Sequence, residues 1–383
     1  MFIQLKRYQW AFLFACASMF VLGLADNIRG PLFPELLNYF QLTNSQGSLT
    51  YAASSTAALT GNMLSAYLLK KMNIGQALLW SMVIMCMGLL GMGLAPTYIS
   101  YILCAVMFGL GLGFLGVMQN LIVAENVSKE MQSKTFSGLH GVYGLSSLLA
   151  PLIASRAPVI FGPWRSAFFI TSAIGAFIYL SSFVFKSETK FEVHHESSEA
   201  NGSVSKWALI TFGGIFAFYV MTEVLVSTRL ALYMRTFFNM DLEASSNYVT
   251  YFFIFLLIGR LIFTFKVFSH NLKKQLNISL VLSIICLALG LWFHPFFLAL
   301  VGLMMAPFYP LSVAYISEET GVHKRKFITF AVSFQSFCII AMHLGVGYLT
   351  DHFGLLYAFT VGFIALGFSL LCVNFHPKVF KAS

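Results

Sequence analysis

Three polar side chains lie inside the first long apolar run of the chain, where a membrane-spanning helix is expected. Asp26, Asn27 and Arg29 belong to the stretch Gly23–Pro34, which also contains two glycines and two prolines that weaken a helix. A charge at bilayer depth costs about 3 kcal/mol or more unless it faces a partner or water. This stretch is therefore the first candidate functional site.

Glu223 is the second carboxylate expected at mid-membrane depth. A carboxyl group suits proton coupling, because partial burial raises its pKa towards neutrality and a neighbouring cation lowers it again. Arg29 follows Asp26 by three residues, which places the two side chains on neighbouring faces of a helix. Arg229 follows Glu223 by six, so cross-helix partners are expected for both. We predict that Asp26 and Glu223 are the proton-coupling residues, and all four groups could converge on one cavity.

Structural roles fit the same charged residues. The carboxylates and arginines can form ion pairs that hold one conformation. Arg29 and Arg229 can bind an anionic substrate through bidentate hydrogen bonds, or they can neutralise the two acids, and both interpretations are open at this point. Arg260, near the inner end of its span, is interpreted as a gate anchor or as a side chain that reaches the headgroups.

Further polar side chains within the apolar runs can bind a polar solute. Amides donate and accept hydrogen bonds, although they also join helices in membranes. A histidine can relay protons or serve as a helix-contact donor, and tyrosines offer ring stacking and hydroxyl contacts. The predicted substrate-binding residues are Asn27, Arg29, Gln119, Asn120, His140, Tyr143, Tyr219, Arg229 and Gln335.

Motifs for enzymatic chemistry are not supported. Gly109, Gly111 and Gly113 are spaced as in a nucleotide-binding loop, but they lie in an apolar membrane run and no P-loop lysine follows. The six cysteines lie inside apolar runs without CxxC spacing, which favours packing over disulfides or a metal site. We predict no enzyme, no cofactor and no metal.

Composition places the chain in a lipid bilayer. Hydrophobic residues make up 58% of it and charged residues only 10%, whereas a soluble domain carries about 25% charged residues. No charged residue occurs between Lys71 and Glu125 or between Lys274 and Glu318, and each stretch fits two helices of about 20 residues. The sequence predicts an all-α membrane protein with the bilayer as its partner.

Charge placement predicts the topology. With a cytoplasmic N-terminus, most of the 23 Lys and Arg residues fall in cytoplasmic segments, as the positive-inside rule requires. The net charge of +9 is thus a topology signal, and no nucleic-acid partner is predicted. We expect a multi-pass protein of the inner membrane with both termini in the cytoplasm.

Twelve transmembrane helices are expected, in two pseudo-symmetric halves of six. Residues 1–186 form the N-terminal half, 187–205 a polar cytoplasmic linker, and 206–383 the C-terminal half. The expected spans are about residues 8–38, 46–70, 75–95, 98–127, 133–157, 162–186, 206–236, 245–269, 275–293, 296–318, 326–350 and 355–376.

The two halves repeat one another. Phe40–Ser48 is similar to Phe238–Ser246 at an offset of 198, and the same offset superposes Gly61 and Asn62 on Gly259 and Arg260. Tandem six-helix halves are typical of secondary transporters, whose substrate site lies at the midplane between the halves.

At this point the chain resembles the major facilitator superfamily over essentially its whole length. Within it, the fucose:proton symporter and glucose/galactose transporter group is the most similar. Three stretches carry the resemblance: Asp26-Asn27 with Pro31 following, Phe218–Tyr233, and Gly302–Pro310. The resemblance implies the twelve-helix fold, alternating access and a monomer.

Two departures from the family pattern stand out. The loop after the second span, Ala66–Asn73, has Lys70 where the superfamily carries an acidic residue. Gly347–Gly354 does fit the Gly-x-Leu-x-Asp shape of that loop, but on the opposite, outer side. The fourth span carries only amides where the sugar symporters carry a carboxylate.

These observations predict a secondary transporter for a small polar solute, with a monosaccharide first, taken up together with a proton. Three alternatives are open. The aromatic composition and the missing fourth-span carboxylate favour proton-driven efflux of an amphipathic compound. An organic-anion carrier would need Arg29 or Arg229. A non-transporting receptor is disfavoured by the short linker and the lack of a soluble domain.

Overall fold

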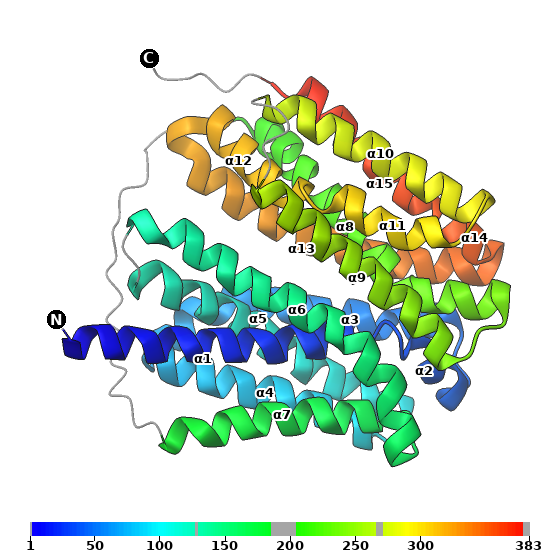
Figure 1. Cartoon of the computed structure of the whole chain (residues 1–383), viewed down its shortest axis with the longest axis horizontal. Coiled ribbons are helices and arrows are strands. Elements are labelled where there is room, and N and C mark those ends of the chain that lie inside the picture. The colour runs from blue at the N-terminus through cyan, green and yellow to red at the C-terminus, as the bar shows by residue number, and fades with distance from the viewer. Residues whose placement is uncertain (1, 127–128, 185–203, 266–270, 378–383) are drawn as a thin grey trace. The chain divides into compact units, whose positions relative to one another are not determined.

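The computed structural model describes residues 2–126, 129–184, 204–265 and 271–377, and these ranges contain helices and no β-strand (Figure 1). The apolar sequence explains this architecture. Backbone N–H and C=O groups in apolar surroundings must be satisfied within the chain, and a helix does so within one segment.

The helices before residue 187 follow the predicted spans closely. They are α1 (Phe2–Asn27), α2 (Phe33–Phe40), α3 (Asn44–Leu69), α4 (Ile74–Leu94), α5 (Tyr98–Asn126), α6 (Lys129–Phe161) and α7 (Ser166–Val184).

The helices after residue 203 follow the same rule. They are α8 (Lys206–Phe238), α9 (Leu242–Phe265), α10 (Leu272–Trp292), α11 (Phe296–Met305), α12 (Phe308–Thr320), the 3₁₀ turn η1 (Gly321–His323), α13 (Lys324–Phe353), α14 (Leu355–Ala358) and α15 (Thr360–Phe375).

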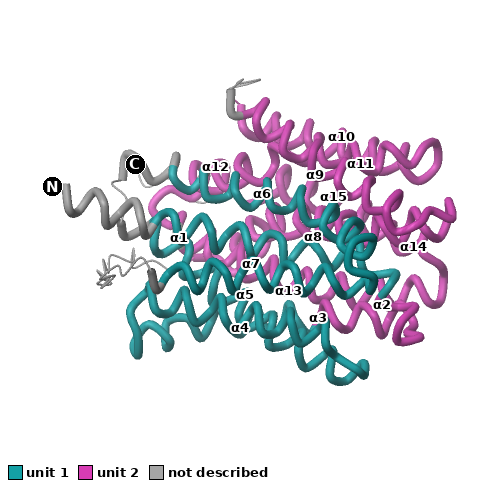
Figure 2. Tube along the Cα trace, turned by 60° about the horizontal axis from the view of Figure 1, so that its bottom comes forward, with its two compact units in different colours: residues 1–35, 53–196 teal, residues 36–52, 197–383 magenta. Residues whose placement is uncertain are grey.

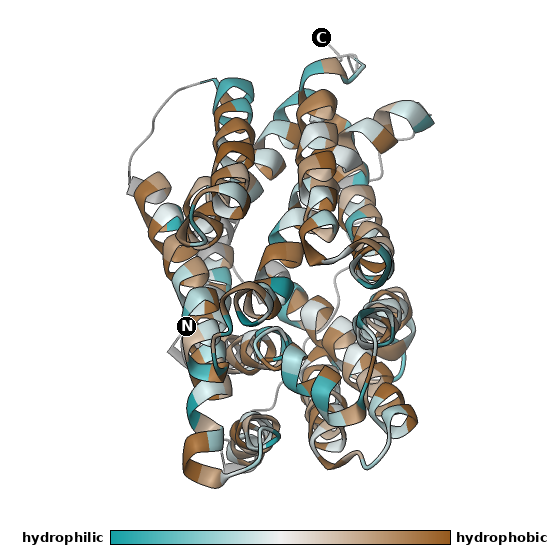
Figure 3. Ribbon diagram, turned by 90° about the vertical axis from the view of Figure 1, so that its right-hand side faces the viewer, coloured by the Kyte–Doolittle hydropathy of each residue, from teal (hydrophilic) through white to brown (hydrophobic). Residues whose placement is uncertain are grey.

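Most of these helices have the length and composition of membrane spans. Among the described residues, nine stretches are long and apolar enough to cross a membrane, and Phe12–Asn27 and Ser166–Ser182 are shorter apolar helices. Hydrophobic residues recur along most of these helices, as the colouring of the ribbon shows (Figure 3). The chain is therefore a multi-pass membrane protein.

Two predicted spans are each interrupted, and proline explains both interruptions. The predicted span 8–38 is α1 and α2, separated by a turn that contains Gly30 and Pro31. The predicted span 296–318 is α11 and α12, separated at Ala306 and Pro307. Proline lacks an N–H group and its ring collides with the preceding turn of a helix. Backbone groups near both interruptions are thus released from the helix ladder.

The chain divides into two compact units (Figure 2). Unit 1 comprises residues Met1–Glu35 and Ala53–Glu196, and unit 2 comprises Leu36–Ala52 and Ser197–Ser383. Leu36–Ala52 precedes the predicted linker in the sequence but lies in unit 2, so α3 begins in unit 2 and continues into unit 1. Apart from its last two residues, the predicted linker 187–205 lies outside the described residues, and the predicted domain boundaries stay a prediction.

Glycines allow neighbouring helices in each unit to pack at backbone distance. In unit 1, a Cβ atom at Gly109 of α5 would lie 2.0 Å from the Ser54 carbonyl oxygen of α3. In unit 2, a Cβ atom at Gly302 of α11 would lie 2.3 Å from the Phe252 carbonyl oxygen of α9. These helices occupy the second and fourth positions of each predicted half. The internal repeat therefore has a counterpart in the packing.

Adding a methyl group at Gly302 should destabilise the protein. Gly302→Ala forces α9 and α11 apart. We expect the free energy of unfolding to fall by about 1–3 kcal/mol, the usual range for overpacking. The midpoint of thermal unfolding in detergent measures it. Gly367→Ala is the matched control, because no heavy atom lies within 4 Å of a Cβ there and alanine favours a helix. Equal midpoints for the two variants would contradict the packing described.

Candidate functional site

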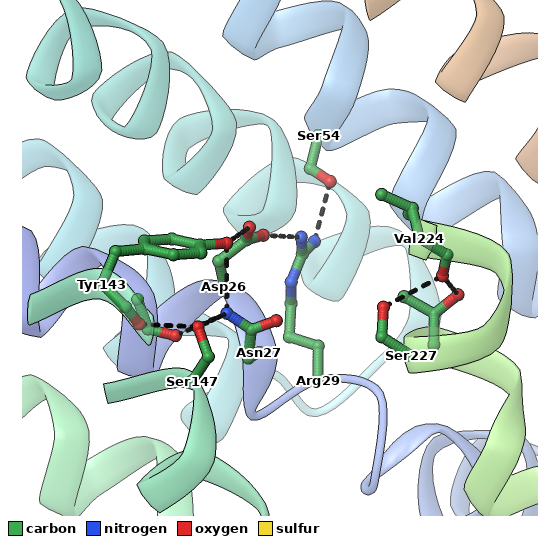
Figure 4. Close-up of polar contacts among 10 residues, drawn as sticks. Asp26, Asn27, Arg29, Ser54, Tyr143, Ser147, Val224 and Ser227 are labelled. Atoms are coloured by element: carbon green, nitrogen blue, oxygen red, sulfur yellow. Dashed lines mark hydrogen bonds and ion pairs between the residues drawn. The ribbon is translucent and has the colours of Figure 1, made fainter. Parts of the chain in front are cut away.

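The carboxylate of Asp26, in the last turn of α1, is the centre of a polar cluster in unit 1 (Figure 4). Its Oδ1 accepts a hydrogen bond from Arg29 Nη2 at 2.9 Å, and its Oδ2 accepts one from the Tyr143 hydroxyl of α6 at 3.2 Å. The Asp26 side chain is 34% exposed and that of Arg29 only 10%. Of this ion pair, the carboxylate is thus the more accessible member.

Asn27 and Ser147 extend this cluster along α6 (Figure 4). Asn27 Nδ2 donates to the Tyr143 hydroxyl at 3.2 Å and to Ser147 Oγ at 2.9 Å, and it lies 2.9 Å from the Gly23 carbonyl oxygen. The Tyr143 hydroxyl thus accepts from Asn27 while it donates to Asp26. The hydrogen bonds therefore run in one direction, from Asn27 through Tyr143 to the Asp26 carboxylate.

Arg29 contacts three helices of unit 1, namely α1, α3 and α5. It lies in the turn after α1, where the interrupted helix turns its side chain back towards Asp26. Its Nη1 donates to Ser54 Oγ of α3 at 2.8 Å, and its Cζ lies 4.7 Å from the Phe108 ring centroid of α5. A guanidinium over an aromatic face is stabilised electrostatically. The positive charge is therefore balanced by Asp26 and anchored by α3 and α5.

A second carboxylate cluster lies in unit 2, around Glu223 of α8. Its Oε2 accepts a hydrogen bond from the Tyr219 hydroxyl, and its Oε1 lies 3.6 Å from Arg260 Nη2 of α9. The buried Tyr219 also lies 2.8 Å from the Met305 carbonyl oxygen and stacks on Phe308. Met305 ends α11, where carbonyl groups have no helical partner. The interrupted helix thus supplies an acceptor to this cluster.

Arg260 is a site residue whose pairing the sequence did not identify. Its position in the sequence predicts a gate anchor or a headgroup contact, but the structure places Arg260 beside Glu223. Glu223 is therefore paired across helices, in agreement with the expectation from the six-residue spacing to Arg229. One sequence signal points to Arg260: it is the single charged residue within the apolar run 244–265.

The two neighbouring amides of α5 have different surroundings. Gln119 is fully buried, and its Nε2 donates to Ser18 Oγ of α1 at 3.0 Å, so it joins two helices. Asn120 is exposed and donates to the Gly116 carbonyl oxygen of its own helix. Consecutive residues point about 100° apart on a helix, which accounts for the difference. Of the two, only Asn120 has an exposed side chain.

The remaining predicted substrate residues differ in their exposure. His140 is exposed on α6, and Gln335 is half-buried on α13. Arg229 of α8 is 1% exposed, and its Nη2 donates to Ser48 Oγ at 2.8 Å. The structure therefore brings together Asp26, Asn27, Arg29 and Tyr143 in unit 1, and Tyr219 with Glu223 in unit 2. The convergence of the two clusters on one site stays a prediction.

The Asp26 cluster offers both kinds of hydrogen-bonding partner to a solute. A partly exposed carboxylate accepts hydrogen bonds only, whereas amide and hydroxyl groups donate as well. Vicinal hydroxyl groups of a small solute both donate and accept, so they match this combination. Among the described residues, no group of three or more His, Cys, Asp or Glu side chains is placed to hold a metal ion. The cluster is suited to binding and proton transfer.

Comparison with known proteins agrees with this architecture. A sequence model of the family described as Major Facilitator Superfamily matches residues 15–342. The chain is 22% identical to the glucose/mannose transporter GlcP of Bacillus subtilis, over 81% of this chain and 82% of that protein. It is 19% identical to the protein TsgA homolog of Serratia proteamaculans, over 85% and 84%. The crystal structure of a D-xylose-proton symporter superposes with a TM-score of 0.79 at 13% identity, over 97% and 99%.

The Asp26–Arg29 pair should show energetic coupling. We expect Asp26→Asn and Arg29→Gln each to destabilise the protein by about 1–3 kcal/mol, because each leaves a charge without its partner. The free energy of unfolding of the double variant should fall by at least about 1 kcal/mol less than the sum of the decreases in the two single variants. Thermal unfolding of the four proteins in detergent measures the cycle. Additive losses would show that the pair contributes no coupling.

Proposed function

Because the chain belongs to the Major Facilitator Superfamily, we propose that it moves a small polar solute across the membrane by alternating access, with a monosaccharide as the first candidate. It is a membrane transporter and not an enzyme. The finer statements that follow, on solute, coupling and topology, are parts of this proposal.

The accessible carboxylate of Asp26 is the observation that carries the proposal. In the Asp26–Arg29 pair the carboxylate is 34% exposed and the guanidinium 10%, so a solute meets an acceptor before it meets a cation. Asn27 and Tyr143 add an amide and a hydroxyl beside it. Sugar hydroxyl groups donate to the carboxylate and exchange hydrogen bonds with the other two.

The names of the similar proteins support the same solute class. The relative from Bacillus subtilis is named as a glucose/mannose transporter, and the solved structure is that of a D-xylose-proton symporter. The second name also supports a proton as the coupling ion. These names were given to other proteins, and they guide the choice of sugars for testing.

Proton coupling follows from the way each carboxylate is paired. Protonation of Asp26 removes its attraction for Arg29, and protonation of Glu223 removes its attraction for Arg260. Each event exchanges an ion pair for a neutral acid beside an arginine. A proton bound at either carboxylate can thus change the contacts between helices, which a coupled transporter requires.

Twelve crossings follow if each interrupted pair of helices, such as α1 with α2 or α11 with α12, counts as one span. The positive-inside pattern then places both termini in the cytoplasm. We propose an inner-membrane protein that acts as a monomer, with the residues before and after the linker as its two halves.

An organic-anion carrier is the rival that the described contacts weigh against. Such a carrier needs an accessible cation, but Arg29 is bound to Asp26 and Ser54, and Arg229 is 1% exposed. Proton-driven efflux of an amphipathic compound is the other rival. It predicts no preference for hydroxylated solutes.

Uptake into proteoliposomes that carry an inward proton gradient distinguishes these functions. The solutes are radiolabelled glucose, mannose, galactose, fucose and xylose, with gluconate as an anion of matched size. Efflux of tetraphenylphosphonium tests the amphipathic rival. We expect accumulation of at least one sugar above equilibrium and none of gluconate. Accumulation of gluconate alone, or efflux of the lipophilic cation alone, would overturn the sugar proposal.

Removing a coupling carboxylate should separate accumulation from exchange. We expect Asp26→Asn or Glu223→Gln to lower uphill sugar accumulation by about ten-fold or more. Sugar exchange between the two sides without a gradient should persist, since it needs no net proton movement. Glu318→Gln is the control, because Glu318 is exposed on α12 and belongs to none of the contacts described for the two clusters. If both carboxylate variants accumulate sugar like the wild type, the assignment of the coupling residues is wrong.

A further inference from the structure

The first two turns of α3 are bound to the end of α13 in unit 2. Asp351 Oδ1 accepts hydrogen bonds from the backbone N–H of Asn44 at 2.8 Å and from Asn44 Nδ2 at 3.0 Å, and its Oδ2 accepts one from the backbone N–H of Ser45 at 2.8 Å. The first N–H groups of a helix have no helical partner, and a carboxylate there is favoured by the helix dipole. A residue 306 positions away in the chain thus caps α3.

One turn further along α3, the contact with α13 is at backbone distance. A Cβ atom at Gly347 would lie 2.7 Å from Ser48 Cβ and 2.9 Å from Ser45 Cα. This approach requires glycine at position 347. Gly347 and Asp351 both belong to the Gly347–Gly354 motif, which has the shape of the family's loop motif on the opposite side and takes no part in the two carboxylate clusters.

Arg229 binds the same turns of α3 from α8. Its Nη2 donates to Ser48 Oγ at 2.8 Å, its Cζ lies 5.2 Å from the Tyr51 ring centroid, and the side chain is 1% exposed. Tyr51 also stacks on His343 of α13, with ring centroids 4.8 Å apart. The guanidinium is thus part of a packed contact and is not accessible to a solute.

We infer that these contacts form a releasable latch, which we call the α3 latch: Asn44, Ser45, Ser48 and Tyr51 bound by Arg229, His343, Gly347 and Asp351. The inference rests on the proposed alternating access. All eight residues belong to unit 2, whereas the rest of α3 continues into unit 1. The latch therefore decides whether the first turns of α3 stay bound to α8 and α13.

The α3 latch assigns two residues to conformational control. Arg229 and Asp351 set how long this end of α3 stays bound, and neither contacts the solute. The assignment replaces the alternative in which Arg229 binds an anionic substrate. With the N-terminus in the cytoplasm, the latch lies at the outer side of the membrane, so its release exposes the first turns of α3 on that side.

Labelling of a cysteine inside the latch measures its release. Ser48 is fully buried, so Ser48→Cys should react slowly with a membrane-impermeant maleimide added outside proteoliposomes of known orientation. Added to this background, Asp351→Asn or Gly347→Ala should accelerate labelling by about five-fold or more. Gly345→Ala on the same helix is the control, because no heavy atom lies within 4 Å of a Cβ at Gly345. The parent without Ser48→Cys accounts for the native cysteines.

The outcomes separate this inference from the proposed function, because labelling needs no solute. Faster labelling in Asp351→Asn and Gly347→Ala, but not in Gly345→Ala, supports the latch even if no sugar is transported. Unchanged labelling in monodisperse samples of both variants overturns it even if sugar uptake is normal. Agreement between the two variants also guards against misfolding of either one.

Arg229→Gln separates conformational control from binding. If Arg229 belongs to the latch, Arg229→Gln should accelerate labelling of Ser48→Cys. The same substitution should change the Kd of an identified solute, measured by thermal shift, by no more than about two-fold. If Arg229 instead contacts the solute, Arg229→Gln should weaken solute binding by about ten-fold or more. Weaker binding with unchanged labelling would overturn the assignment of Arg229 to the latch.

Discussion

The need to neutralise charge inside apolar helices is the constraint on which this structure depends. A carboxylate or guanidinium at bilayer depth is stable only with a partner or water, and the two carboxylates within long apolar runs each have one. Asp26 is paired with Arg29 at 2.9 Å, and Glu223 lies 3.6 Å from Arg260. Both pairs lie near helix interruptions, where proline has freed backbone groups.

Much of the fold follows from the sequence because hydrophobicity and proline act locally. Charge-free runs placed the helices to within a few residues, and Pro31 and Pro307 lie at the interruptions of α1–α2 and α11–α12. The number of helices does not follow in the same way, since hydropathy does not distinguish an interrupted span from a continuous one. The assignment of Leu36–Ala52 to unit 2 depends on contacts some 300 residues apart, which no local pattern encodes.

The candidate site was predictable where the sequence spacing is short. Asp26 and Arg29 are three residues apart, and this short spacing brings their side chains together although Arg29 lies in the turn after α1. The partners from other helices were not predictable in detail. Tyr143 was among many tyrosines, and Arg260 could equally reach a headgroup. Gln119 and Asn120 show the same limit, because the rotation of α5 alone decides which amide is buried.

The central claim is that the carboxylate cluster around Asp26 moves a proton together with a sugar. The most direct test traps a pH-sensitive dye inside proteoliposomes without a pH gradient and adds the best-bound sugar outside. The account predicts acidification of the lumen that begins with sugar addition and is absent in Asp26→Asn or Glu223→Gln liposomes. Sugar entry at the wild-type rate with no change in luminal pH would contradict it.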